Sequence, residues 1–248
     1  MEAYELAFQV GLETVEKIKT TQKAAIQTAG ELIGQAHRLG HHFYVSGSGH
    51  SHTVAEEFYA RAGCLAFTIP ILTNELTLTE HPTKSTHLER LEGYATILAD
   101  LYEIGAGDVI VIASNSGRNA YPVELALTCK ERGCKVIAIT CMDHSLHVES
   151  RHSSGKKLYE LADVVIDNCG KMGDAATKME GVDVPILPTS SIANAFIVSA
   201  ISATVMETLN REGFEVEVFT SNNVDGGDAR NEAYFKRYTR MYIQEKRD

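Results

Sequence analysis

Two serine-rich loops carry the residues of this chain whose types and spacing could do chemistry. Residues 46–51 are Ser-Gly-Ser-Gly-His-Ser, and residues 114–119 are Ser-Asn-Ser-Gly-Arg-Asn. Each loop follows an apolar run typical of a strand and precedes a segment typical of a helix. A glycine-rich turn of this kind points main-chain N–H groups and the positive end of the helix dipole at one place, where anions bind. The accompanying hydroxyl and amide side chains favour a phosphate ester on a hydroxyl-rich molecule, so the loops predict a phosphosugar site.

A third group of hydroxyl side chains lies much later in the chain. Thr189, Ser190 and Ser191 open a long segment rich in small residues, which predicts a helix over residues 189–212. In open parallel sheets, ligands bind outside the carboxyl ends of the strands. Because both loops leave such ends, we expect the third group to close over the same crevice.

The elements that must position these groups alternate between strand and helix. The apolar patterns predict helices at residues 53–62, 121–132 and 189–212, and strands at residues 43–45, 65–72, 109–113, 136–140 and 164–166. Residues 4–39 predict one long amphipathic helix, or two with a break near Thr20 and Thr21. This alternation predicts an α/β protein with a parallel, doubly wound sheet.

Composition restricts the class of protein further. The chain has 248 residues, is 44% hydrophobic and carries a net charge of −10, which argues against a nucleic-acid-binding surface. Its five cysteines include no CxxC pair, so neither a disulfide framework nor a zinc site is expected. We found neither a signal peptide nor an apolar stretch of roughly 18 uncharged residues. These features predict a cytoplasmic protein without a membrane partner.

The order and spacing of the three hydroxyl-rich groups resemble the sugar isomerase (SIS) domain family over roughly residues 30–212. The similarity is greatest to the branch of the phosphoheptose isomerases. It implies a three-layer sandwich with a five-stranded parallel, flavodoxin-like sheet, and a phosphosugar ligand without a redox cofactor. It also implies a homodimer or homotetramer with sites near the subunit boundaries. We expect an N-terminal helical extension (residues 1–40), a SIS domain (41–213) and a C-terminal helical tail (214–248), the extension and tail contacting a second subunit.

The resemblance also implies which residues bind the ligand. The second loop would hold the phosphate, the first loop would contact phosphate or sugar, and the third group would complete the site. The implied residues are Ser114, Asn115, Ser116, Gly117 and Asn119 in the second loop, Ser46, Ser48, His50 and Ser51 in the first, and Thr189, Ser190 and Ser191 in the third. Phosphoheptose isomerases carry Gln and His in the helix that follows, as metal-binding and catalytic residues. This chain has no His between residues 189 and 212, so no metal is predicted.

An aldose–ketose isomerisation needs a carboxylate that moves a proton between neighbouring carbons, and a second acid/base group. Glu57 follows the first loop, and unlike Glu56 it is not explained by a capping box with Thr53. The polar connection at residues 73–93 adds His87 and Glu89, in a segment that loosely resembles one in pentose-phosphate isomerases. Glu57, His87 and Glu89 are therefore the candidate catalytic residues; the alternatives are a solvated helix face for Glu57 and an idle loop histidine for His87.

Two other functions remain open at this point. A phosphosugar sensor would use the same anchor without an acid/base pair, and a phosphosugar lyase would release a fragment. A DNA-binding regulator is disfavoured, because residues 1–36 hold five acidic and three basic side chains.

Overall fold

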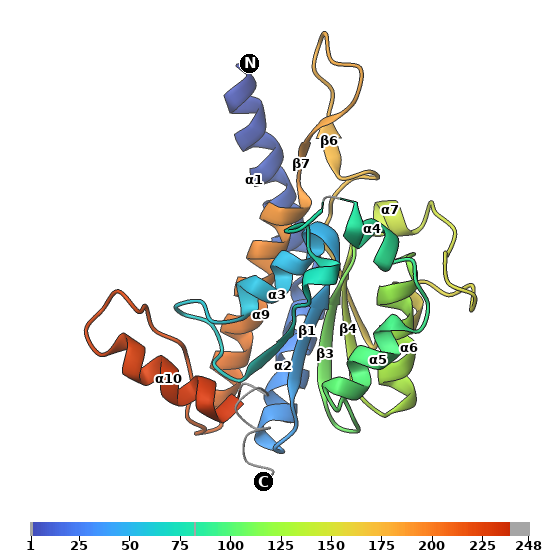
Figure 1. Cartoon of the computed structure of the whole chain (residues 1–248). Coiled ribbons are helices and arrows are strands. Elements are labelled where there is room, and N and C mark those ends of the chain that lie inside the picture. Colours follow the sequence, from blue (N-terminus) through green and yellow to red (C-terminus); the bar gives the residue numbers. More distant parts are fainter. Residues whose placement is uncertain (1, 82, 239–248) are drawn as a thin grey trace.

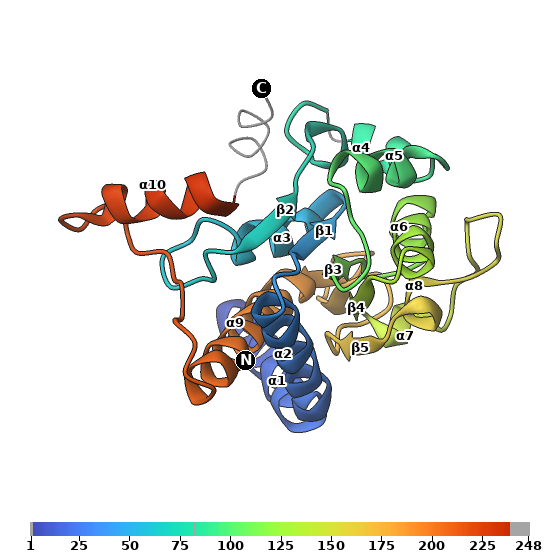
Figure 2. The ribbon, with the colours of Figure 1, turned by 90° about the horizontal axis from the view of Figure 1, so that it is seen from below.

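A parallel five-stranded sheet forms the centre of the computed structural model, which describes residues 2–81 and 83–238. Its order is β2-β1-β3-β4-β5, the flavodoxin-like arrangement of a doubly wound sheet. Figure 1 labels the central strands β1, β3 and β4, and Figure 2 labels all five. The strands are β1 (Phe43–Gly47), β2 (Thr68–Ile71), β3 (Val109–Ala113), β4 (Lys135–Thr140) and β5 (Val164–Asp167). The predicted fold class is therefore confirmed.

Helices cover both faces of the sheet, which explains the unbroken apolar runs of the central strands. Phe43 and Val45 of β1 point into one core, and Tyr44 points into the other. Figure 2 shows the two helical layers on opposite sides. The first contains α1 (Ala3–Thr21), α2 (Lys23–Arg38), α3 (Thr53–Phe58) and α9 (Ser190–Arg211), and the second contains α5 (Tyr94–Leu101), α6 (Ala120–Glu131) and α8 (Leu158–Leu161).

The N-terminal helical segment is broken at Gln22, which confirms the second of the two predicted alternatives, a pair of helices with a break near Thr20 and Thr21. After the break, α2 packs closely against α9. A Cβ atom at Gly30 would lie 2.5 Å from Cγ2 of Thr204, so only glycine permits this approach. By length and composition α9 could cross a membrane, but half of it is buried as the core helix of this layer.

Two predicted boundaries between the first loop and the second strand are wrong. Helix α3 ends at Phe58 rather than residue 62, and β2 begins at Thr68 rather than residue 65. Residues 63–66 instead pair with a distant segment: the N–H of Gly63 donates to the carbonyl of Phe219 (2.9 Å), and that of Ala66 to the carbonyl of Glu217 (2.9 Å). Local patterns do not reveal a partner that lies so far away in the sequence.

The remaining elements are short or peripheral. The connection at residues 73–93 holds η2 (Asn74–Leu76) and α4 (Lys84–Leu88), and the antiparallel hairpin of β6 and β7 projects beyond the sheet (Figure 1). The others are η1 (Gly49–His52), α7 (Met142–Ser145), β6 (Ala175–Thr177), β7 (Ile186–Pro188) and α10 (Gly227–Tyr238). Helix α10 lies within the predicted C-terminal tail, of which residues 239–248 fall outside the described part of the chain.

Candidate functional site

A cavity of about 370 Å³ lies at the carboxyl ends of β1 and β3. These neighbouring strands form the point where the winding of the sheet reverses, the usual ligand position in this class of fold. The structure brings the three hydroxyl-rich groups of the sequence to this one cavity. It is lined by Ser48, Gly49, His50, Ser51, Glu89, Ser114, Asn115, Ser116, Asn119, His144, Asp174, Pro188, Ser190 and Ser191.

Glu89 joins the two serine-rich loops. Its carboxylate accepts a hydrogen bond from Oγ of Ser48 (2.7 Å) and another from Nδ2 of Asn119 (2.7 Å). Arg151 donates to Oδ1 of Asn119 (3.0 Å), which fixes the amide so that its NH₂ group faces the carboxylate. The main chain is also held, because the N–H of Tyr121 donates to the carbonyl of Glu89 (2.9 Å). Asn119 is the N-cap residue of α6, but its side chain binds Glu89 instead of capping the helix.

Burial raises the pKa of the Glu89 carboxyl above its ordinary value. The hydrogen bond from Ser48 and the positive charges of Arg90 and Arg151 oppose this effect without cancelling it. A carboxylate with a raised pKa is a better proton acceptor than one with an ordinary pKa. Glu89 therefore has the properties of a general base that faces a ligand cavity.

Asp174 already occupies the N-terminus of α9. Its carboxylate accepts hydrogen bonds from the N–H (2.9 Å) and Oγ (2.7 Å) of Ser190, and from the N–H of Thr189 (3.2 Å). The positive end of this helix thus has a resident anion. The second loop, at the N-terminus of α6, is the better place for a ligand phosphate.

The second loop has a tightly constrained main chain. Gly117 adopts a φ of 58°, and its N–H donates to Oγ of Ser114 (3.2 Å). Thr140 donates to the carbonyl of Ser114 (2.7 Å), which ties the loop to the end of β4. A Cβ atom at Gly117 would lie 3.2 Å from Oγ of Ser145 and 3.3 Å from Cβ of Leu158. Both the positive φ and the close packing require glycine here.

His144 lines the cavity from α7, the short helix after β4, a role that the sequence analysis did not assign to it. Its Nδ1 is buried and has no hydrogen-bond partner among the described residues. Burial, reinforced by the positive charge of Arg118, lowers the pKa of His144, so the imidazole is neutral near pH 7. Its position shortly after the carboxyl end of a parallel strand was the available signal.

Several predicted residues lie outside the cavity. Ser46 is fully buried beneath the first loop, where its hydroxyl and the phenol of Tyr121 form a 2.6 Å hydrogen bond. His87 lies on α4 and does not line the cavity. Because residues two apart on a helix point in directions that differ by about 200°, the side chain of His87 faces away from the cavity that Glu89 lines. Gly117 and Thr189 support the lining without forming it.

Glu57 is also absent from this cavity. It lies on the side of α3 that faces α9, where it forms an ion pair with Arg61. Sequence position alone could not show this, because two adjacent glutamates on a helix point in directions about 100° apart. Asp174, by contrast, gave no sequence signal, since it lies 15 residues before Thr189, to which it bonds.

Among residues 2–81 and 83–238, no cluster of three or more His, Cys, Asp or Glu side chains has the arrangement of a metal site. The polar groups of the cavity are hydroxyls, amides, imidazoles and the carboxylates of Glu89 and Asp174. Such a set binds the phosphate and hydroxyl groups of a small polar ligand.

Comparison with known proteins agrees with this arrangement. The profile of the SIS domain matches residues 8–141, more than half of the chain. A UPF0309 protein of Halalkalibacterium halodurans is 46% identical over 226 residues, covering 91% of this chain and 93% of that protein. A UPF0309 protein of Thermoanaerobacter pseudethanolicus is 40% identical over 230 residues, which cover 91% of this chain and 93% of that protein. The chain therefore belongs to the SIS domain family and, within it, to the UPF0309 proteins.

Solved structures show the same fold at low sequence identity. Phosphoheptose isomerase GmhA from Neisseria gonorrhoeae superposes with a TM-score of 0.56 and 17% identity, over 84% of this chain and 97% of that one. The NanR protein of Vibrio vulnificus, solved in complex with ManNAc-6P, superposes with a TM-score of 0.53 and 13% identity, over 100% of this chain and 71% of that one. At these identities the likeness is one of fold.

Proposed function

We propose that this protein binds a phosphorylated sugar in the cavity at the carboxyl ends of β1 and β3, and isomerises it between its aldose and ketose forms. The observation that carries the proposal is the half-buried Glu89 carboxylate, held by one side chain from each serine-rich loop. Membership of the SIS domain family supports a phosphosugar ligand. Two fold relatives, a phosphoheptose isomerase and a protein in complex with ManNAc-6P, support it too.

The phosphate is assigned to the second loop. Its main-chain N–H groups and the hydroxyls of Ser114 and Ser116 lie at the N-terminus of the 12-residue helix α6. The first loop then provides Ser48, His50 and Ser51 for the sugar hydroxyls. This division leaves the reacting carbons near Glu89, on the side of the cavity where Ser48 and Asn119 hold the carboxylate.

Glu89 is assigned the proton transfer between carbons. As a carboxylate it removes the proton from the carbon next to the carbonyl, which leaves an enediolate, and as a carboxylic acid it returns the proton to the neighbouring carbon. The neutral imidazole of His144 is assigned the matching transfer between the two oxygens, a task for which a lowered pKa suits it. Neither His87 nor Glu57 is needed for this scheme.

Proton exchange with solvent tests the reaction even before the sugar is identified. We would incubate the protein in D₂O with a panel of aldose and ketose phosphates of five to seven carbons and record ¹H spectra. An isomerase replaces the hydrogen next to the carbonyl with deuterium and forms the isomeric sugar. If no sugar that binds exchanges its hydrogen, the isomerase assignment is contradicted.

The same experiment separates the alternatives. A sensor would bind a sugar phosphate, as the ManNAc-6P complex of the NanR protein illustrates for that relative, and would cause no exchange. The absence of His from α9 is the feature of this chain that favours a sensor. A lyase would release a new fragment that is visible in the same spectra.

A second copy of the chain is the expected partner. Helix α1 exposes a row of large apolar side chains, Tyr4 (63% exposed), Phe8 (69%) and Leu12 (67%), beside Ile192 and Phe196 of α9. An apolar surface of this extent on a helical extension favours a protein contact. Light scattering after gel filtration would give the mass; a dimer or tetramer agrees with the proposal, and a monomer at micromolar concentration contradicts it.

A further inference from the structure

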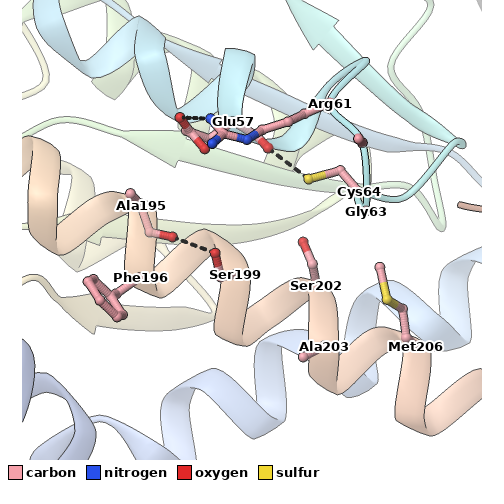
Figure 3. A pocket seen from close by; sticks show the side chains of 11 residues that line it. Glu57, Arg61, Gly63, Cys64, Ala195, Phe196, Ser199, Ser202, Ala203 and Met206 are labelled. Atoms are coloured by element: carbon pink, nitrogen blue, oxygen red, sulfur yellow. Dashed lines mark hydrogen bonds and ion pairs between the residues drawn. The ribbon is translucent and has the colours of Figure 1, made fainter. Parts of the chain in front are cut away.

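A second cavity, of about 350 Å³, lies between α9 and the chain that follows α3. Figure 3 shows it, with Glu57, Arg61 and Cys64 on one side and residues of α9 on the other. None of its lining residues belongs to the cavity that holds Glu89. Its volume is within the range of small-molecule sites, about 300–1,000 Å³.

Ser202 gives this cavity an unmet polar group. The residue is 4% exposed, and its Oγ is buried with no hydrogen-bond partner among the described residues. Serines in helices commonly donate to the carbonyl four residues earlier, as Ser199 does to Ala195 (2.9 Å). Ser202 does not, and in Figure 3 it points from α9 toward the Cys64 segment across the cavity. A buried hydroxyl left unpaired destabilises the folded state, so a ligand that pairs with it gains affinity.

The charged groups of this cavity form a neutral pair, and its thiol is uncharged. The Glu57 carboxylate is paired with the Arg61 guanidinium. The thiol of Cys64 donates to the carbonyl of Glu57 (3.0 Å), and burial raises its pKa, which keeps it neutral. A cation already paired with a carboxylate offers little to a phosphate, whose charges the same carboxylate repels. The cavity therefore favours a ligand without net charge.

The rest of the wall includes apolar side chains of α9, those of Ala195, Ala203 and Met206. A sugar ring matches this combination, because its C–H face packs on apolar groups while its hydroxyls bond to carboxylate, guanidinium and serine groups. We propose that the cavity between α3 and α9 binds a neutral, hydroxyl-rich molecule of monosaccharide size, at a site separate from that of the phosphorylated ligand. Ser202 is the residue on which its recognition depends.

Methyl glycosides are the appropriate probes, since their locked ring has no free carbonyl and they cannot be isomerised. Binding of the methyl α-glycosides of D-glucose, D-mannose and D-galactose to the full chain would be followed by saturation-transfer NMR. At least one should give a signal. Ser202→Ala should weaken its affinity by about fivefold or more, the loss expected for one hydrogen bond between neutral groups. Thr28→Ala, which removes a hydroxyl bonded to its own helix outside both cavities, should change the affinity by less than about twofold.

Ser116→Leu separates this proposal from the proposed function. It blocks the first cavity, so it should abolish binding of sugar phosphates and leave the glycoside signal unchanged. The melting temperature of Ser202→Ala should be no lower than that of the wild type, which excludes loss of binding through unfolding. The proposal is overturned by the absence of signal from all three glycosides, by a signal that survives Ser202→Ala at full strength, or by its loss in Ser116→Leu.

Discussion

The two cavities of this protein differ in how their polar groups are satisfied. At the carboxyl ends of β1 and β3, side chains bond to one another: Glu89 accepts from Ser48 and Asn119, and Asp174 accepts from Ser190. Between α3 and α9, the hydroxyl of Ser202 is buried without a partner among the described residues (Figure 3). The loops of the first cavity are thus joined around Glu89 before a ligand arrives, although Nδ1 of His144 has no partner there among the described residues, whereas no such network surrounds Ser202 in the second.

This difference separates the effect of a substitution on folding from its effect on ligand binding. In the first cavity the same hydrogen bonds hold the loops and aim the reactive groups, so a substitution there affects folding and function. In the second, removal of the unpaired Ser202 hydroxyl should weaken ligand binding without any loss of stability. Substitutions of the same type in the two regions therefore test the comparison.

The largest effect is expected for Glu89→Gln. Glutamine keeps the size of the side chain but accepts no proton, so turnover should fall about 10²–10⁴-fold. Deuterium exchange into the sugar phosphate measures this loss directly. Glu92→Gln, three residues later and bonded to Ser153 outside the cavity, is the matched control and should keep full turnover. Equal turnover in Glu89→Gln and the wild type would remove Glu89 from the reaction.

The next effect concerns the phosphate anchor. A sugar phosphate at 100 times its dissociation constant stabilises the folded protein by roughly 2.7 kcal/mol, which thermal shift measures readily. Ser116→Leu should abolish this shift for every sugar phosphate, because its side chain fills the space beside the second loop. Ser154→Leu, at an exposed loop position outside the cavity, should retain it. A shift that persists in Ser116→Leu would place the anchor elsewhere.

Two buried serines give the sharpest comparison of stability. Ser46→Ala leaves the buried phenol of Tyr121 without its 2.6 Å partner, and should lower the free energy of unfolding by about 1–3 kcal/mol. Ser202→Ala removes a buried hydroxyl that has no such partner, and should leave the free energy of unfolding unchanged or raise it. Urea unfolding of both variants measures the difference. Equal losses would mean that Ser202 is paired within the folded protein.

The smallest effect is the pH dependence contributed by Glu89. Because burial raises its pKa above the ordinary value of 4.5, the folded state holds this proton more tightly than the unfolded state. The wild type should therefore lose stability relative to Glu89→Gln as the pH rises from 4.5 through the folded pKa, and the difference should be constant above it. Urea unfolding of both proteins from about pH 4 to about pH 8 measures this difference. A difference that grows in the opposite direction would show a lowered pKa.

Much of the fold was predictable because its signals are local. The apolar run Val109–Ala113 and its counterparts indicate strands buried on both faces, and the glycine-containing loops that follow them mark the ligand edge of the sheet. The meeting of the three hydroxyl-rich groups follows from the rule that ligands bind where parallel strands share one carboxyl edge. That rule does not depend on side-chain contacts.

The choice among acid/base residues was not predictable from the sequence. Glu57 follows the first serine-rich loop and Glu89 lies in the polar connection at residues 73–93, so both were candidates. Only the rotation of α3 and the position of the end of α4 decide which of them faces the cavity. Asp174 and His144 come from segments with no motif, and they reach the site through the path of the chain after β4 and β5. The pairing of residues 63–66 with residues 217–219 likewise depends on contacts between distant parts of the chain.

A crystal structure with a bound sugar phosphate, chosen by the thermal-shift screen, tests the central claim most directly. The account predicts that the phosphorus atom lies against residues 114–119, with the carbonyl end of the sugar next to the Glu89 carboxylate. A phosphate bound at the α3–α9 cavity or on any other surface, with the space beside Ser116 unfilled, would contradict it.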